Sequence, residues 1–193
     1  MIRAALCGPS GSGKTTLATW LADELGTMIN PVGSRSVARA MGFESPYDVD
    51  KAGKRTAFQE RLQAEKIAWE LAHDSFVTDR TTLDELVYSG MHGTPTAAYE
   101  RAALGHMARY THVFYCPFDV FCDLGDDPKR NHSMDYQREF DAKLAERIVS
   151  LEVASVVGVW TLDVADLDKR KSFIRNVLGL PMAVRDTKQG RES

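Results

Sequence analysis

A glycine-rich turn near the N-terminus places the tightest constraint on how this chain can fold. Residues 8–15 are G-P-S-G-S-G-K-T, so Gly8 and Gly13 bracket four residues and Lys14 and Thr15 follow. This spacing matches the phosphate-binding loop G-x-x-x-x-G-K-[ST] in full. Such a loop joins a strand to a helix. The apolar run at residues 2–7 and the helical pattern at residues 14–25 provide both.

The composition of the loop predicts a site for the phosphates of a nucleotide. Glycines allow backbone N–H groups to point inward at a polyanion, and the start of the next helix adds partial positive charge. We expect Lys14 to reach the β- and γ-phosphates and Thr15 to offer its hydroxyl to Mg²⁺. The residues expected to bind the nucleotide are Gly8, Ser10, Gly11, Ser12, Gly13, Lys14, Thr15 and Thr16. A glycine turn that binds nothing would need neither the lysine nor the threonine.

Strand and helix patterns alternate along the rest of the chain. Strands are predicted at residues 2–7, 27–30, 75–79, 112–118 and 156–162. Helices are predicted at residues 14–25, 51–74, 82–89, 95–110, 135–150 and 166–178, with a further short helix capped by Ser34 or Ser36. In the helix at 51–74, Phe58, Leu62, Trp69 and Ala72 share one face. This alternation predicts a parallel sheet between helices, with ligands at the carboxyl ends of the strands.

Composition favours an ordinary globular protein. The 193 residues suit one domain at 1–180, followed by a loose tail at 181–193. The three cysteines are expected to be reduced, and no apolar run is long enough to span a bilayer, so we expect a cytoplasmic protein with no signal peptide. A net charge of −3 gives no global attraction to nucleic acid. The five histidines show no metal-ligand spacing, so no metal beyond Mg²⁺ is expected.

Other motifs choose among the reactions that a phosphate-binding loop can serve. The chain lacks the N-K-x-D motif of GTPases and the L-S-G-G-Q motif of transporter ATPases. Residues 76–90, FVTDRTTLDELVYSG, instead resemble the nucleoside and nucleotide kinases, thymidylate kinase especially. The resemblance implies a three-layer α/β/α P-loop NTPase fold with a five-stranded parallel sheet and a lid segment. It also implies an ATP- and Mg²⁺-dependent kinase, acting on a hydroxyl or phosphate of a nucleotide-type acceptor.

The same resemblance implies roles for individual residues. Asp79 matches the acid at the strand end that organises Mg²⁺ or the acceptor hydroxyl, and Arg80 matches the arginine that grips the substrate. A helix cap with a solvated neighbour is the other interpretation of this pair. The lid is expected at about 123–135. Arg130 there, and less strongly Lys129 and, further on, Arg138, would stabilise the transferring phosphoryl group. A solvated surface loop is the alternative.

The acceptor is less constrained by the sequence than the reaction. Arg35 and Arg39 are four residues apart, so on a helix they would either clamp an acceptor phosphate or form ordinary exposed surface. Phe43, Tyr47 and Tyr88 are candidates for stacking on a base, although core packing is the commoner role of such aromatics.

Two further resemblances suggest particular acceptors. One is to phage P-loop kinases of 5-hydroxymethyluracil in DNA, and the other is to kinase domains that act on nicotinamide riboside. For DNA, Arg35, Arg39, Lys51, Lys54 and Arg55 form a modest basic cluster on the acceptor side, and the host cytoplasm would be the location. The alternatives are a kinase of free nucleosides or nucleoside monophosphates, and an ATP-binding regulatory NTPase without an acceptor. Kinases of this shape are often dimers, so a homodimer is a further candidate.

Overall fold

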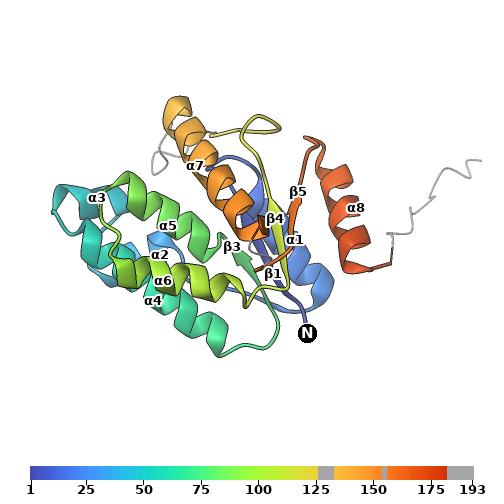
Figure 1. Cartoon of the computed structure of the whole chain (residues 1–193), viewed down its shortest axis with the longest axis horizontal. Helices are drawn as coiled ribbons and strands as arrows, with labels where there is room; N and C mark the ends of the chain where they lie inside the picture. Colours follow the sequence, from blue (N-terminus) through green and yellow to red (C-terminus); the bar gives the residue numbers. More distant parts are fainter. Residues whose placement is uncertain (126–132, 154–155, 182–193) are drawn as a thin grey trace, which may run out of the picture.

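The computed structural model describes residues 1–125, 133–153 and 156–181. In these residues five strands form one parallel sheet with the order β2-β3-β1-β4-β5 (Figure 1). The strands are β1 (Arg3–Cys7), β2 (Met28–Ile29), β3 (Phe76–Asp79), β4 (His112–Tyr115) and β5 (Val159–Thr161). The helices are α1 (Lys14–Leu25), α2 (Ser34–Ala40), α3 (Pro46–Lys51), α4 (Arg55–Leu71), α5 (Thr82–Met91), α6 (Ala97–Met107), α7 (Met134–Val153) and α8 (Leu167–Leu178).

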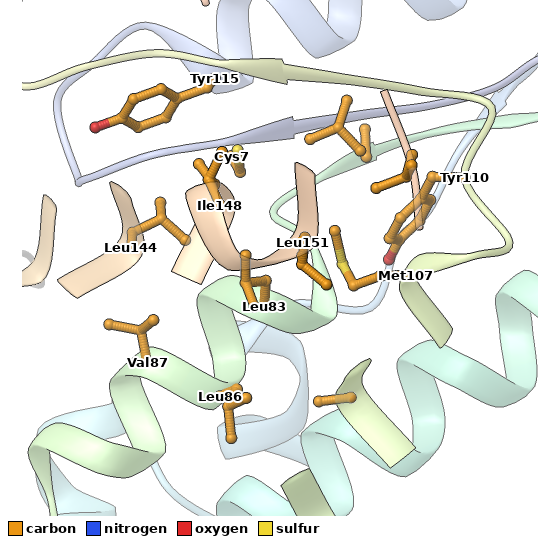
Figure 2. Close-up of a cluster of buried hydrophobic side chains, with 14 of the residues drawn as sticks. Cys7, Leu83, Leu86, Val87, Met107, Tyr110, Tyr115, Leu144, Ile148 and Leu151 are labelled. Carbon is orange, nitrogen blue, oxygen red and sulfur yellow. The ribbon is translucent and has the colours of Figure 1, made fainter. Parts of the chain in front are cut away.

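Helices cover both faces of the sheet. Side chains alternate between the two faces along each strand, so each strand contributes to two cores. In β1, Ala4 and Leu6 pack in one core with residues of α1 and α8. Ala5 and Cys7 belong to the other core, with α5, α6 and α7. Figure 2 shows the second core, where Leu83 of α5 and Leu144 and Ile148 of α7 lie below Cys7. The predicted α/β fold with three layers and a five-stranded parallel sheet is therefore confirmed.

A third, smaller core lies beyond the sheet and joins α2, α3 and α4. Val37 and Ala38, Val49, and Phe58 and Leu62 are its buried residues. The prediction of one helix at residues 51–74 is wrong at its start. The chain turns at Gly53, whose φ is +63°, so α3 ends at Lys51 and α4 begins at Arg55. α4 also ends at Leu71, and Ala72, predicted on the apolar face, is exposed.

Other element boundaries differ from the predictions by a few residues. α2 is capped by Gly33 and not by Ser34 or Ser36. Ser36 instead accepts a hydrogen bond from the Gly33 N–H at 3.0 Å, from inside the helix. β2 is only two residues long, because Pro31 follows soon after and has no N–H for a ladder.

Several expectations concern the chain as a whole. Cys7 and Cys116 are reduced and buried, and the half-buried Cys122 thiol donates to the Ser10 carbonyl at 3.4 Å. In the described ranges no helix is long and apolar enough to cross a membrane. Residues 126–132 of the expected lid, with Lys129 and Arg130, lie outside the described residues, as does the tail from residue 182. The single domain at 1–180, its lid and its tail therefore stay predictions.

Candidate active site

The loop between β1 and α1 folds as the sequence predicts, and two of its glycines have no room for a side chain. Gly8 has a φ of +137°, and a Cβ there would lie 2.4 Å from the carbonyl oxygen of Cys116. Gly11 has a φ of +84°, and its Cβ would lie 2.7 Å from the carbonyl oxygen of Asp123. The segment after β4 thus packs directly on the loop, and the Asp123 N–H donates to the Gly11 carbonyl at 3.0 Å.

Lys14 is buried at the start of α1 and lies back on the loop. Its amine donates to the Pro9 carbonyl and, at 3.1 Å, to the Ser12 hydroxyl. Burial, followed by the nearby charge of Arg80, lowers the pKa of Lys14 below its usual value. Lys14 nevertheless lines a cavity beside the loop, as do Gly13, Thr15 and Thr16. A polyanion in the loop would give this buried ammonium group the counter-charge that the Pro9 carbonyl supplies only in part.

Thr15 and Asp79 meet although they are far apart in the sequence. Parallel pairing aligns Leu6 of β1 with Asp79 of β3, which sets Asp79 beside the beginning of the loop. The Thr15 hydroxyl donates to Asp79 Oδ2 at 2.5 Å. Asp79 Oδ1 is buried and has no hydrogen-bond partner among the described residues.

These two side chains fit a magnesium ion. A buried carboxylate oxygen without a partner, beside a hydroxyl, is the hard oxygen donor set that Mg²⁺ takes in phosphate sites. Mg²⁺ usually binds through one or two protein groups together with substrate phosphates and water. In the ranges that the structure describes, no group of three or more His, Cys, Asp or Glu side chains could hold a metal ion.

Arg80 is held in an unusual backbone conformation next to the loop. Its φ is +82°, the only positive φ of a non-glycine residue in the described ranges. Its guanidinium group donates to the Ser10 hydroxyl at 3.1 Å and lies 4.9 Å from the centre of the Tyr88 ring. Burial opposes its charge, but Tyr88, Asp84 and Asp79 outweigh that effect and raise the pKa of Arg80. Arg80 is therefore a fixed cation at the phosphate-binding loop.

Three buried residues that the sequence did not single out hold this arrangement. Lys66 of α4 donates to the Arg80 carbonyl at 2.9 Å and to the Thr78 hydroxyl at 3.1 Å. Asp84 of α5 accepts from the Gly8 N–H at 3.0 Å and from the Thr81 N–H at 2.8 Å. Gln137 of α7 accepts from the Ser10 N–H at 2.8 Å. Only Asp84 carried a signal, since T-x-x-D at the start of a helix is a capping pattern.

A cavity of about 920 Å³ extends from the phosphate-binding loop to α2, α3, α4 and α5. The predicted residues Arg35, Arg39, Asp79 and Arg80 all line it, and so do Tyr47 and Tyr88. Phe43 instead packs against the core of α2, α3 and α4. Arg138 does not line the cavity, because its guanidinium group pairs with Asp135 at 3.2 Å and lies over the Phe118 ring.

The half of the cavity away from the loop contains polar groups that lack complete pairing. Gln59 is 3% exposed, and its Oε1 has no partner among the described residues. Arg55 bonds to His92 and pairs with Asp50, but its Nε has no partner in the same residues. Glu85 is 4% exposed, and burial raises the pKa of its carboxyl group. Phe58 and Leu62 provide apolar walls. A ligand with hydrogen-bonding edges would satisfy these groups.

Comparisons with known proteins agree with this geometry. A family model described as an AAA domain (AAA_28) matches residues 3–166. A comparison with curated proteins finds no match.

Three solved structures illustrate the similarity of fold. Deoxyadenosine kinase from M. mycoides with bound dATP is 14% identical, over 92% of this chain and 100% of that chain, with a TM-score of 0.63. NadR protein in complex with NR is 14% identical, over 96% of this chain and 54% of that chain, with a TM-score of 0.63. Shikimate kinase from Acinetobacter baumannii in complex with shikimate is 19% identical, over 93% and 94% of the two chains, with a TM-score of 0.51. The fold is thus that of P-loop kinases.

Proposed function

The chain belongs to the AAA domain family (AAA_28), and we propose that it is a kinase that transfers the γ-phosphoryl group of ATP to a nucleotide-type acceptor, with Mg²⁺. The observation that carries this proposal is the contact of Thr15 with Asp79 at 2.5 Å, next to a complete phosphate-binding loop. The loop lines a cavity, and the half of that cavity away from the loop (the far half) contains polar groups of its own. A kinase needs two such adjoining sites, one for the donor and one for the acceptor.

Each residue of the loop region has a role in this mechanism. Phosphoryl transfer requires in-line placement and neutralisation of charge, and it requires little covalent chemistry from the protein. The loop amides and Lys14 would hold the phosphates of ATP. Arg80, held by Ser10 and Tyr88, would stabilise charge on the transferring group. Arg130, which lies outside the described residues, stays a proposed second cation from the lid.

Thr15 and Asp79 would hold the magnesium ion, directly or through water. An ion held by these two residues would supply positive charge against the charge that develops on the phosphates. Asp79 or a neighbouring residue would also orient the acceptor hydroxyl.

The cavity favours an acceptor with a nucleobase. The buried acceptor atoms of Gln59 and Glu85, together with the donor of Arg55, match the mixed hydrogen-bonding edge of a base. Phe58, Tyr47 and Tyr88 provide the flat apolar surroundings on which a base stacks. The similar structures include kinases with nucleotides bound, dATP in one and the products dCMP and dCDP in another, which supports this class of acceptor.

A hydroxymethylated base in phage DNA is the more specific form of this proposal. Arg35 and Arg39 are exposed at the cavity, and the exposed Lys51 and Lys54 lie next in sequence to Asp50 and Arg55, which line it. These cations would contact a DNA backbone. A base within a duplex would have to be flipped out at a cost of about a few kcal/mol, whereas a free nucleoside avoids that cost.

A transfer assay tests the proposal. The protein is incubated with γ-labelled ATP, Mg²⁺ and a panel of nucleosides, nucleoside monophosphates, shikimate and DNA that contains 5-hydroxymethyluracil. We expect label on a nucleoside, a nucleotide or the modified DNA, and none on shikimate. Label found only as free phosphate across the panel would contradict the proposal and favour an ATP-hydrolysing regulator.

A further inference from the structure

An aromatic side chain lies beside the end of the phosphate-binding loop that is remote from Arg80. Phe121, in the segment after β4, lines the cavity and is 39% exposed. Two carbon atoms of its ring lie 3.9 Å from the position that a Cβ would take at Gly13. The ring is therefore open to a ligand in the cavity and adjacent to the phosphate-binding loop.

Arg170 of α8 braces this ring from beneath the loop. It is 1% exposed, and its guanidinium carbon lies 5.5 Å from the centre of the Phe121 ring. Its Nη1 donates to the Ser12 carbonyl at 2.8 Å, and its Nε donates to the Val164 carbonyl at 2.5 Å. One buried side chain therefore fixes the Phe121 ring, the phosphate-binding loop and the segment after β5 relative to one another.

The direction of a bound nucleotide follows from the loop itself. Arg80 bonds to Ser10 near the start of the loop. This end of the loop faces the half of the cavity proposed for the acceptor (the acceptor half), so the terminal phosphate belongs beside Ser10 and Arg80. The loop then runs to Gly13, the N-cap of α1, whose backbone amides would bind the phosphates nearer the ribose. The ribose and base must continue beyond Gly13, and Phe121 is the aromatic residue beside it.

We propose that Phe121, braced by Arg170, is the platform on which the base of the donor nucleotide stacks. This inference rests on the proposed function only in that the loop binds a nucleoside triphosphate. Because Arg170 already fixes the orientation of the Phe121 ring, the ring loses little conformational freedom when a base stacks on it. The bracing therefore increases the affinity gained from stacking. Arg170 itself is a positioning residue and does not touch the base.

The test compares a nucleotide with a ligand that has phosphates but no base. Binding of MgATP and of magnesium tripolyphosphate to the full chain is measured by calorimetry for the wild type, Phe121→Leu and Phe121→Trp. Leucine keeps an apolar contact with Arg170 but lacks an aromatic face. We expect Phe121→Leu to weaken MgATP binding about tenfold and to leave tripolyphosphate binding unchanged. Phe121→Trp should retain the affinity of the wild type for MgATP.

A matched control is Phe173→Leu, because Phe173 is 37% exposed on α8 and does not line the cavity. It should bind both ligands as the wild type does. Unchanged MgATP binding in Phe121→Leu would overturn the platform and leave the proposed function intact, and so would an equal loss for both ligands. A wild-type protein that binds neither ligand would overturn both.

Discussion

At the scale of single residues, the candidate site depends on a few side chains whose environment differs from that of free amino acids in water. Lys14 is buried and lies against the Pro9 carbonyl, and Asp79 has one oxygen on Thr15 and one without a partner among the described residues. Groups held in this way are costly in the absence of a ligand, because their desolvation is not fully compensated. A bound ligand that supplied partners for Lys14 and Asp79 would explain why both are held in this way.

Substitutions of these two residues should separate the transfer step from nucleotide binding. Lys14→Ala removes a buried cation of the phosphate-binding loop, so the transfer rate should fall about 10³-fold with the fold intact. Asp79→Asn should abolish transfer with a smaller loss of ATP affinity, because the loop amides remain. Circular dichroism checks the fold, and calorimetry measures the affinity. Transfer at the wild-type rate in either variant would refute the role assigned to that residue.

Glu85 allows a prediction for pH dependence. Burial raises its pKa, so this group favours the folded state at low pH and loses that contribution as the pH rises through its folded-state pKa. Glu85→Gln removes the buried charge, and it should raise the melting temperature at neutral pH. At about pH 4 the two proteins should melt alike, because Glu85 is then largely protonated in the wild type.

The Glu85→Gln variant should also bind the acceptor more weakly. The buried Glu85 carboxyl group would then lower the stability of the fold and contribute to acceptor binding. Acceptor KM should rise while ATP KM stays the same, since Glu85 lies in the far half of the cavity. A melting temperature that does not differ at any pH would show that the carboxyl group is solvated and not buried.

At the scale of elements, the junction between β3 and α5 places most of the chemistry. Arg80 takes a left-handed conformation there, which strains a residue with a side chain and must be stabilised by its surroundings. Lys66 of α4 supplies part of that stabilisation through the Arg80 carbonyl. The junction also sets Asp84 under the Gly8 N–H, so a short segment of α5 supports both Arg80 and the loop.

The role of Lys66 can be tested with a lysine of the same chain as control. Lys66→Met leaves the Arg80 carbonyl with the Thr78 hydroxyl at 3.2 Å but removes its buried charged donor, and it should destabilise the fold by about 2 kcal/mol. The transfer rate should also fall more than the affinity for ATP, because Arg80 would no longer be held in place. Lys143→Met, at a lysine side chain of α7 that is 50% exposed and does not line the cavity, should change neither quantity. If Lys66→Met is destabilised but transfers at the wild-type rate, Lys66 is structural only.

Sequence patterns predicted the elements near the loop well and the helices beyond the sheet less well. The loop, α1 and β3 follow from local motifs, so their bounds agree closely with the structure. The break between α3 and α4 was missed because the predicted helix runs across Gly53, whose positive φ the amphipathic pattern does not reveal. Lys66 and Gln137 were missed for a different reason. Their partners lie 14 and 127 residues away in the sequence, and nothing local marks such contacts.

At the scale of the whole molecule, the C-terminal helix is tied to the N-terminal loop. Arg170 of α8 reaches the Ser12 carbonyl across 158 residues of sequence, on the face of the sheet that α1 and α8 share (Figure 1). The donor half of the cavity is therefore built from segments near both ends of the described chain. The acceptor half is lined by residues of α2 to α5.

Loss of Arg170 should reduce global stability. Arg170→Met removes two charge-assisted hydrogen bonds to backbone carbonyls, and we expect a loss of about 2 kcal/mol or more. For a chain of this length that corresponds to a fall of about 4–8 °C in melting temperature. Arg175→Met on the same helix is the control, because Arg175 pairs with Glu24 and lies over the Trp20 ring, and both of these partners belong to α1 and not to the loop. An equal melting temperature for Arg170→Met and the wild type would show that α8 does not stabilise the loop.

The central claim is that the Thr15–Asp79 pair and the loop beside it hold the metal and phosphates of a nucleotide. A crystal soaked with Mn²⁺ and a non-hydrolysable ATP analogue tests it directly, because the anomalous signal of Mn²⁺ locates the metal. We predict one peak next to Thr15 and Asp79, with the direct contact between them replaced by contacts to the metal and its waters, and the triphosphate within the loop. A nucleotide bound elsewhere, or a metal peak away from Asp79, would contradict the account.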